Sequence, residues 1–337
     1  MAHKTIDSTK RDFLAAVSRL TLAAGLSALP WQLQAGPKPS PRIKLLLDTD
    51  IGSDIDDAVA LAYLLQQPEV ELLGITTVTG ESRKRSALAT YLVNQSTLHL
   101  PVLSGIEVPR VIQQRQATAP QALKLPAHIL TTLPASHDPE QAIDYLANVI
   151  RANPGEITLL AVGPFTNVAR LFEREPDVSS LLKELVIMGG KYSDFPTPWG
   201  PTEWNAIVDP QATDLMFQTA QCPIRAFGLD ITWQLYMTPN EVRNQFTLHP
   251  LLETVLAWSE VWFAKRDLLH FHDPLAAACL VNPDICNYVQ GTVTVDLKST
   301  KTAGITTFEA NPHGNVRIAS GVNPARFFST FFAPFRR

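Results

Sequence analysis

Hydrophobic residues along most of the chain form short aliphatic runs that alternate with longer segments of helical spacing. The runs expected to form buried strands are 43–47, 70–78, 157–162, 184–188 and 224–229. The segments expected to form helices are 56–67, 83–95, 139–151 and 210–220. This alternation is typical of a mainly parallel sheet whose strands are connected by crossover helices. We therefore predict an α/β fold with a Rossmann-like central sheet flanked by helices.

The remaining segments complete a single domain over residues 42–337. Further elements are expected as helices within 239–282, strands or hairpins within 289–319, and a last helix from Pro324. Two irregular segments, 108–139 and 191–205, lack either periodicity. Ligands of such sheets bind where loops meet the carboxyl ends of the strands, so we expect these two segments to lie over a site.

The first 35 residues differ from the rest of the chain. Lys10 and Arg11 precede an apolar run at 20–29, which is the order of a secretory signal, and the run is too short to span a bilayer. The segment resembles a twin-arginine signal with Lys10 in place of the first arginine. A proline-rich linker follows at 36–41. We predict export to the periplasm without a stable membrane anchor; without a working signal the protein stays in the cytoplasm.

Composition narrows the choice of partner. Of the 337 residues, 45% are hydrophobic, which is enough to bury a full core, and the net charge is -4. Without an excess of basic residues, no nucleic acid partner is expected, and a small molecule is the expected substrate. The cysteines, Cys222, Cys279 and Cys286, are too few for a disulfide scaffold. They are expected as buried thiols, or with a Cys279–Cys286 bridge if the chain is exported.

An acidic loop follows the first predicted strand. Its carboxylates are those of Asp48, Asp50, Asp54, Asp56 and Asp57. Carboxylates this close together behind a buried strand repel one another, so they need a compensating cation. Oxygen ligands on a short loop suit calcium or magnesium, and no paired Cys or His set points to zinc. The alternative is a solvated acidic turn in which Asp54 caps the next helix.

Two other kinds of site begin with closely spaced aspartates like those of this loop. An EF-hand beginning at Asp48 would need a glycine at its sixth position and a glutamate at its twelfth, where Ser53 and Val59 stand. That pattern is excluded. A phosphatase with Asp48 as nucleophile fits Asp48-Thr49-Asp50 better and would need a later lysine, for which Lys191 is a candidate.

Motifs along the chain add a more specific indication. In order, they are Asp48-Thr49-Asp50 with Gly52, Asp56-Asp57-Ala58, Gly74-Ile75-Thr76-Thr77-Val78, Val162-Gly163-Pro164-Phe165-Thr166-Asn167, Val186-Ile187-Met188-Gly189-Gly190, Glu203-Trp204-Asn205 with Asp209-Pro210, and His272-Asp273-Pro274. Together they resemble the inosine-uridine-preferring nucleoside hydrolases, from about residue 43 to 330. The order and spacing of the motifs make the resemblance specific.

The resemblance implies roles for particular residues. Those matching the calcium ligands are Asp50, Asp57, the main-chain carbonyl of Val162, and Asp273. Those matching contacts to the sugar are Asp56, Met188 beneath the ribose, Glu203 and Asn205. The family's mechanism makes Asp50 the general base, since metal binding lowers the pKa of the attacking water. It places His272 beside the base as proton donor or hydrogen-bond partner.

Some positions depart from the family's pattern. Glu81 stands where an asparagine that contacts ribose is usual, and we assign it to the substrate site on that basis. The acidic loop is two residues longer than in the best-known members, which gives Asp54 a place near the ion. No asparagine lies between Lys191 and Trp204, so Thr197 or Trp199 would contact the 5′ hydroxyl. Four tryptophans are candidates for base stacking or for core packing: Trp199, Trp204, Trp233 and Trp262.

The resulting prediction is calcium-dependent hydrolysis of the N-glycosidic bond of a ribonucleoside, giving ribose and a free base. Calcium is preferred to magnesium as the single bound ion. The alternative is a secreted nucleoside- or ribose-binding protein of the same fold without hydrolytic activity, which the change to Glu81 motivates. A homo-oligomer, either a dimer or a tetramer, is expected from the family.

Overall fold

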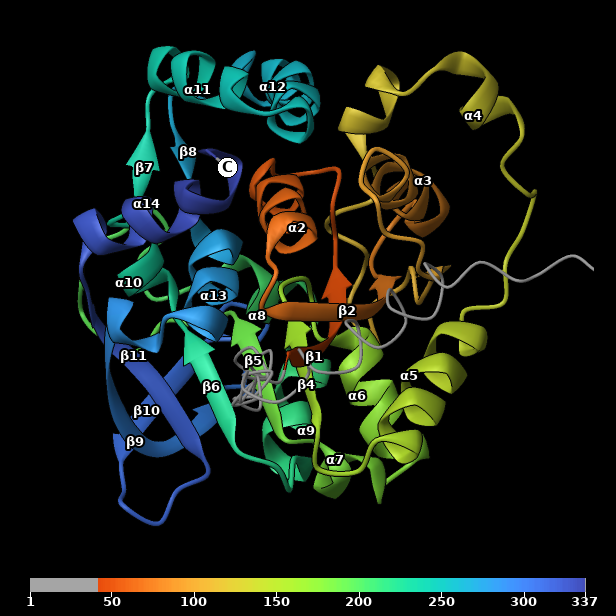
Figure 1. Cartoon of the computed structure of the whole chain (residues 1–337). Coiled ribbons are helices and arrows are strands. Elements are labelled where there is room, and N and C mark those ends of the chain that lie inside the picture. Colours follow the sequence, from red (N-terminus) through yellow and green to blue (C-terminus); the bar gives the residue numbers. More distant parts are fainter. Residues whose placement is uncertain (1–41, 337) are drawn as a thin grey trace, which may run out of the picture. The chain divides into compact units, whose positions relative to one another are not determined.

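The computed structural model describes residues 42–336 (Figure 1). The predicted export signal, 1–35, and the linker, 36–41, lie outside the described residues. Within the described part, no helix is long and apolar enough to cross a membrane.

A nine-stranded sheet forms the centre of the fold (Figure 1). Its strands, in spatial order, are β10 (Thr306–Ala310), β9 (Cys286–Val295), β11 (Val316–Val322), β6 (Ile224–Phe227), β5 (Glu184–Met188), β4 (Ile157–Ala161), β1 (Ile43–Thr49), β2 (Val70–Thr77) and β3 (Val102–Ser104). Every neighbouring pair from β3 to β11 is parallel, and only β9 and β10 add antiparallel pairings. From β3 to β6 the order is 3-2-1-4-5-6, which reverses direction between β1 and β4. This reversal is where doubly wound sheets bind ligands.

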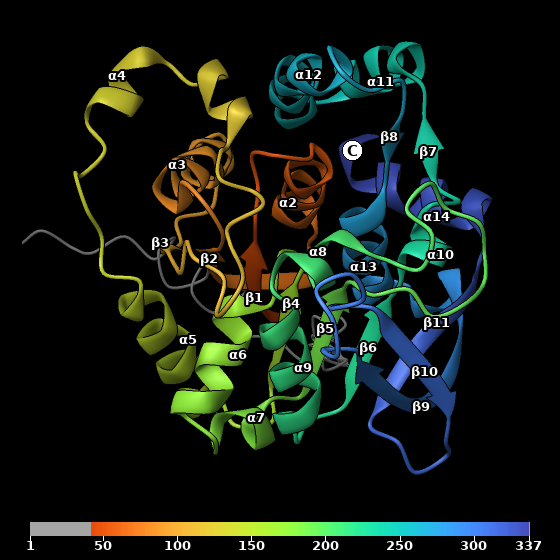
Figure 2. The ribbon, with the colours of Figure 1, turned by 180° about the vertical axis from the view of Figure 1, so that it is seen from behind.

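Helices pack on both sides of the sheet (Figures 1 and 2). On one side lie α2 (Asp56–Gln66), α3 (Ser82–Val93), α12 (Pro250–Phe263), α13 (His272–Val281) and α14 (Pro324–Phe332), and on the other α5 (Glu140–Ala152), α6 (Thr166–Arg174), α7 (Val178–Leu181) and α9 (Pro210–Thr219). Strand residues alternate between the two cores: Leu45 and Leu47 face one, and Leu46 faces the other. Both faces of the sheet are therefore buried, as the continuous aliphatic runs predict.

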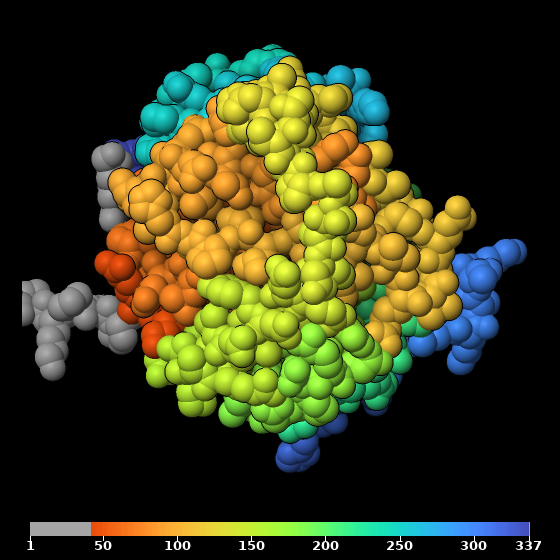
Figure 3. Space-filling model, turned by 90° about the vertical axis from the view of Figure 1, so that its right-hand side faces the viewer, coloured from red at the N-terminus to blue at the C-terminus, as the bar shows by residue number. Residues whose placement is uncertain are grey.

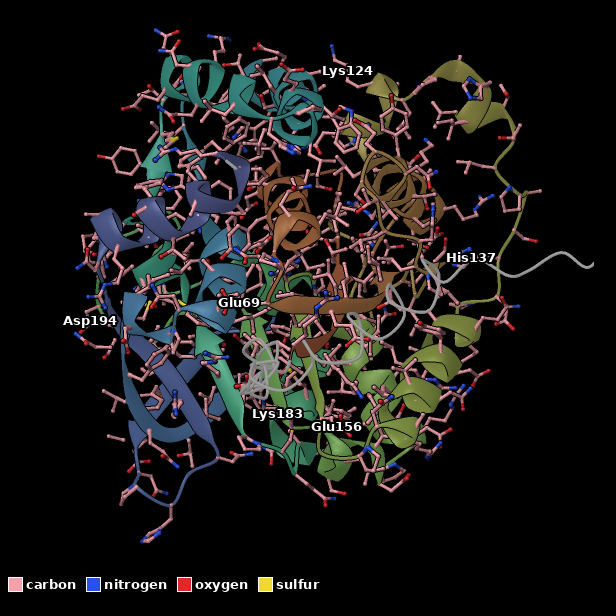
Figure 4. All side chains as sticks on the ribbon, in the orientation of Figure 1. Glu69, Lys124, His137, Glu156, Lys183 and Asp194 are labelled. Carbon is pink, nitrogen blue, oxygen red and sulfur yellow. The ribbon has the colours of Figure 1, made fainter. Side chains whose placement is uncertain are left out.

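Short elements complete the domain. They are η1 (Pro120–Lys124), α4 (Ala127–Thr131), α8 (Trp204–Val208), α10 (Leu229–Thr232), β7 (Tyr236–Met237), α11 (Pro239–Gln245), η2 (Phe246–Leu248), β8 (Leu269–His270), η3 (Pro283–Ile285) and η4 (Ala333–Arg336). The chain between β3 and α5 crosses the outside of α3 (Figure 3). Lys124, at the end of η1, lies beside α12 (Figure 4). This crossing segment is anchored by His137, whose Nε2 lies 2.8 Å from the carbonyl oxygen of Gly105.

The α/β prediction is confirmed, with corrections to individual elements. The predicted strand 184–188 coincides with β5. The predicted helical stretch 239–282 is interrupted by β8, which pairs with β7. Neither strand was predicted, because strands of two residues are too short to show a hydrophobic period. The segment 108–139 is not wholly irregular, since it contains η1 and α4. Strand β3 was not predicted either, because three residues are too few to show a hydrophobic period.

The three cysteines are buried and free. The Sγ atoms of Cys279 and Cys286 lie 3.8 Å apart, in contact but unbonded. The expected buried thiols are thus present. The bridge expected in an exported chain stays a prediction.

Candidate active site

A cavity of about 580 Å³ opens where the loops after β1, β4 and β5 meet the first turns of α2 and α13. Two chemically different groups of side chains stand out in its lining. We call the first the acidic floor, which consists of Asp50, Asp54, Asp56, Asp57 and Asp273. We call the second the aromatic wall, which consists of Trp199, Trp233, His270 and His272.

The acidic floor is assembled by strand ends and helix starts. Asp50 follows β1, and Gly52, with a φ of +117°, turns the chain back toward α2. Asp56 and Asp57 occupy the first turn of α2, while Asp273 occupies the first turn of α13. Helix N-termini favour negative charge, because their unpaired N–H groups point toward it. The main-chain nitrogen of Asp273 donates to Asp56 Oδ2 at 3.0 Å, which joins the two helix starts.

The floor fits a hard divalent cation. One oxygen from each of Asp56, Asp57 and Asp273 lies within 4.8 Å of the others, and all three residues are buried. Carboxylate oxygens without nitrogen or sulfur ligands are the donor set of calcium and magnesium. The structure thus brings together Asp57 and Asp273, as the sequence predicts for the ion. It adds Asp56, which was assigned to the sugar.

Burial makes these carboxylates costly to ionise. It raises the pKa of Asp54 to about 6, and it raises the pKa values of Asp56, Asp57 and Asp273 well above their usual range, with neighbouring carboxylates adding to the effect. Burial also raises the pKa of Asp50, against the opposing charge of Arg85. One guanidinium therefore does not compensate the floor. A cation bound there would favour the ionised forms.

Arg85 on α3 is fully buried beneath the acidic floor and donates hydrogen bonds to main-chain carbonyls around it. Its Nε donates to Gly80 O at 2.8 Å, Nη2 to Thr118 O at 3.0 Å, and Nη1 to Ile51 O at 3.2 Å and to the carbonyl oxygen of Asp50. The guanidinium thus ties the acidic loop, the turn after β2 and the segment before η1 to one another. Sequence reasoning missed Arg85, because nothing in the pattern distinguishes it from an exposed helical arginine.

The predicted ligands keep some oxygens free. Thr49 Oγ1 donates to Asp57 Oδ1, and Gln116 Nε2 donates to Asp50 Oδ2. The other carboxylate oxygen of each aspartate has no hydrogen bond from the described protein part. The carbonyl of Val162 accepts from Asn205 Nδ2 at 2.6 Å and retains a second lone pair. After Val162 only glycine fits, because a Cβ at Gly163 would lie 2.9 Å from both the main-chain nitrogen and Oδ1 of Asp50.

The predicted sugar contacts Met188, Glu203 and Asn205 all line the cavity. Asn205 uses its amide nitrogen on the carbonyls of Val162 and Met188, which leaves its Oδ1 toward the cavity. Glu203 caps α8 and accepts from the main-chain nitrogens of Asn205 and Ala206 and from that of Gly190. Burial raises the pKa of Glu203 to about 7, although these three N–H groups oppose the shift.

Glu81 does not line the cavity, which corrects the place expected for it. Its backbone is left-handed, with a φ of 59°. Its carboxylate accepts from the main-chain nitrogen of Ala119 at 2.8 Å and pairs with Lys84. The side chain is therefore directed to the neighbouring segment, where it supports the loop that carries Gln116.

The aromatic wall is a set of packed rings. Trp233 stacks on His270 at 3.7 Å between ring centroids and 13° between planes, and His270 stacks on His272 at 5.4 Å and 13°. Trp199 meets Trp233 edge-on at 5.0 Å. Burial lowers the pKa of His272 to about 3 and that of His270 to about 4, so both rings are neutral near pH 7.

Among the cavity residues that sequence reasoning missed, His270 and Gln116 contact predicted site residues. His270 lies two positions before the predicted His272 and was not assigned a role, although a second histidine so close to the motif is a usable signal. Gln116 connects Asp50 to the indole Nε1 of Trp204, which donates to Gln116 Oε1. It stands in the segment expected to cover the site, but no pattern singles it out. Trp262 also lines the cavity, beside Arg266.

The phosphatase reading is not supported. Asp48, its nucleophile, is fully buried and lies outside the cavity lining; its Oδ1 accepts from Thr76 Oγ1 at 2.6 Å and from Asn167 Nδ2 at 2.7 Å. Lys191, its lysine, donates to Ser193 O at 2.6 Å. Asp48 therefore has a structural role in linking β1 to β2 and α6.

The fold and cavity are those of an α/β protein with a cavity beside a buried acidic cluster, at the edge of the sheet where such folds bind small ligands. The profile of the family described as inosine-uridine preferring nucleoside hydrolase matches residues 45–329. The chain belongs to this family, and it is accordingly a hydrolase of N-glycosyl compounds. Nucleoside hydrolases of this family depend on a metal ion, and this chain contains a buried acidic cluster of Asp56, Asp57 and Asp273.

Named relatives and solved structures agree with the family. The chain is 30% identical over 267 residues to a probable uridine nucleosidase 1 of Oryza sativa subsp. japonica, covering 76% of this chain and 82% of the relative. It is 29% identical over 270 residues to a pyrimidine-specific ribonucleoside hydrolase of Escherichia coli, covering 76% and 84%. The structure of a plant nucleoside hydrolase aligns with a TM-score of 0.72 at 26% identity, covering 88% of this chain and 99% of that one.

Proposed function

We propose that the protein hydrolyses the N-glycosidic bond of ribonucleosides in a calcium-dependent reaction that gives ribose and a free base. The observation that carries this proposal is the acidic floor, buried and short of positive charge, in the same cavity as the aromatic wall. The floor suits a ribose that becomes positively charged as the bond breaks, and aromatic rings suit a planar base.

Asp50, Asp57, Asp273 and the carbonyl of Val162 would hold the ion. When bound, calcium would supply a positive charge that lowers the pKa of a nearby water molecule and attracts the hydroxyls of the ribose. Asp50 takes a proton from the water as the water oxygen bonds to C1′ of ribose. The C1′–N bond breaks and its electron pair leaves with the base, which accepts a hydrogen bond from His272. The base then takes a proton from solvent, and Asp50 releases to solvent the proton that it took from the water, so that ribose and the neutral base result.

The other cavity residues act on the sugar. Asp56 and Asn205 Oδ1 accept hydrogen bonds from ribose hydroxyls, and Met188 packs beneath the ring. Glu203 sets the start of α8, and with it the position of Asn205. Carboxylates and amide oxygens around the ribose stabilise the transition state more than the neutral substrate, because positive charge develops only as the bond breaks.

Calcium is preferred to magnesium because of the number and arrangement of oxygens. The floor offers several carboxylates from two helices and one loop, and calcium accepts six to eight oxygens in irregular geometry, whereas magnesium demands a near-ideal octahedron. Uridine is the first nucleoside to test, since relatives in rice and Escherichia coli are named for uridine or pyrimidine ribonucleosides.

The test is release of reducing sugar from uridine, cytidine, inosine, adenosine and 2′-deoxyuridine by the purified protein, with calcium and with a chelator. We expect ribose from at least one ribonucleoside, only with the ion, and little product from the deoxynucleoside. If calorimetry detects nucleoside binding but no nucleoside yields sugar, the protein is the binding protein of the same fold, and the proposal is wrong.

The N-terminal 35 residues are proposed to export the protein. The twin-arginine-like order of charge and apolar run supports this. The mature chain from the native cell should begin near Gly36. N-terminal sequencing that finds residues 2–10 intact would show that the signal is not used.

A further inference from the structure

Thr232 lies behind the aromatic wall, within hydrogen-bond distance of His272. It is the last residue of α10 and is fully buried. Its Oγ1 lies 2.7 Å from Nδ1 of His272. Its main-chain nitrogen donates to Gly228 O at 3.1 Å, so α10 fixes the hydroxyl relative to the end of β6.

The surroundings of Thr232 determine which nitrogen of His272 carries the proton. Within residues 42–336, His272 Nδ1 is the only hydrogen-bond partner of the Thr232 hydroxyl. If Nδ1 carried the proton, it would donate to Thr232 Oγ1, and the buried hydroxyl proton would have no acceptor. Buried donors without acceptors are costly and rare. The hydroxyl therefore donates to Nδ1, and the neutral imidazole carries its proton on Nε2.

The protonated nitrogen faces the cavity. His272 lines the cavity, and its Nε2 has no hydrogen bond to any described residue, nor is it among the buried atoms left without a partner. The stacked rings of Trp233 and His270, nearly parallel to one another, fix the plane of the His272 ring. Two contacts thus act on one imidazole: Thr232 sets its tautomer, and the stack sets its orientation.

We propose that Thr232 is a positioning residue that keeps His272 in the Nε2–H tautomer, so that His272 donates a hydrogen bond to the departing base. This inference rests on the proposed function and deepens it. In the opposite tautomer, Nε2 would present a lone pair to the base and repel the electron pair that leaves with it. The hydroxyl of Thr232 thereby decides whether the wall helps or hinders departure of the base.

The test compares Thr232→Val, which keeps the shape and removes the donor, with Thr232→Ser, which keeps the donor. Substrates are uridine, whose base needs a hydrogen bond to depart, and 4-nitrophenyl riboside, whose phenolate does not. For Thr232→Val we expect kcat with uridine to fall by about 10- to 100-fold, within the range of acid–base assistance, with KM nearly unchanged. Hydrolysis of the nitrophenyl riboside should change by less than about threefold, and Thr232→Ser should restore uridine hydrolysis.

Two further measurements separate positioning from packing. In a His272→Ala background, Thr232→Val should have no additional effect on uridine hydrolysis, because both changes remove one interaction. In ¹⁵N-histidine NMR spectra, His272 of the parent should show a protonated Nε2 and an unprotonated Nδ1. Thr232→Val should shift these signals toward a mixture of tautomers. Thermal unfolding of the variant checks that it is folded.

The inference is overturned if folded Thr232→Val hydrolyses uridine like the parent, if it loses both substrates equally, or if NMR places the proton on Nδ1 of the parent. If the parent releases ribose from neither substrate, the proposed function fails and the catalytic benefit of Thr232 fails with it. The NMR signals still decide the tautomer in that case, so the two failures are distinguishable.

Discussion

The acidic floor and the aromatic wall share one cavity but are built in different ways. The floor takes four of its five members from the eight residues 50–57 that follow β1, and hydrogen bonds from Arg85 and Thr49 anchor that stretch on the side away from the cavity. The wall takes its members from a loop, from the residue after α10, from β8 and from the start of α13. Its outer member, Trp199, is 51% exposed, whereas four of the five floor residues are at most 6% exposed and only Asp54 is partly buried.

This difference in construction suggests that the floor and the wall act on different parts of the substrate. Rigid, buried carboxylates at strand ends suit the step common to every substrate, the attack of water on ribose. The rings come from a loop and from short elements outside the central sheet, so they can change without disturbing the sheet and suit the part of the substrate that varies, the base. Substitutions in the floor should therefore affect all leaving groups alike, and substitutions in the wall should distinguish between them.

Asp50→Asn should have the largest effect. It keeps the shape of the side chain, but it removes the proposed base and weakens the cation site. We expect kcat to fall by more than about 10,000-fold, beyond the loss of acid–base help alone, and equally for uridine and 4-nitrophenyl riboside. Steady-state kinetics with both substrates measures this. Near-normal hydrolysis by Asp50→Asn would remove Asp50 from the mechanism.

Removal of the cation should come next. Dialysis against a calcium chelator should abolish hydrolysis of both substrates, and added calcium should restore it. The melting temperature should also fall, because an ion that binds only the folded state stabilises it, but circular dichroism should still show the native fold. Elemental analysis that finds neither calcium nor magnesium in active protein would contradict the prediction.

Arg85→Met should destabilise the domain without removing any cavity residue. Four carbonyl contacts and the charge that opposes the floor are lost together, so we expect the free energy of unfolding to fall by about 3–5 kcal/mol. The matched control is Arg83→Met on the same helix, whose side chain is only half-buried and should cost less than about 1 kcal/mol. Urea denaturation compares the two, and equal losses would refute the role of Arg85.

Trp199→Ala should have the smallest effect. The indole is half exposed and touches the wall only by its edge-on contact with Trp233. We expect KM for nucleosides to rise about three- to tenfold with kcat nearly unchanged, since a stacking contact binds ground and transition states alike. Kinetics with uridine and inosine should show different rises. A fall in kcat equal for every substrate would place Trp199 with the floor instead of the wall.

The sequence predicts the floor better than the wall for a physical reason. Carboxylates directly after a buried strand must lie at the carboxyl edge of the sheet, so the local pattern places the acidic loop there, and the family resemblance singles out Asp50 and Asp57 within it. Gln116 could not be assigned to the site from the sequence. Its position depends on a contact distant in the chain, the hydrogen bond from Arg85 to the carbonyl oxygen of Thr118, two residues after Gln116. The sequence analysis expected Glu81 at the substrate, but its left-handed backbone directs the side chain toward Ala119. No feature of the neighbouring sequence predicts that backbone conformation.

The hydrogen bond between Asp273 and Asp56 has a consequence for how the protein is made. These residues are 217 positions apart in the chain. A nascent chain that has completed β1 and α2 exposes four crowded carboxylates without their partner, and it must wait for most of the remaining sequence before α13 arrives. Closing so long a loop is slow relative to local helix formation. The proposed cation would therefore be captured only in the last stage of folding, and an occupied site would mark a finished molecule.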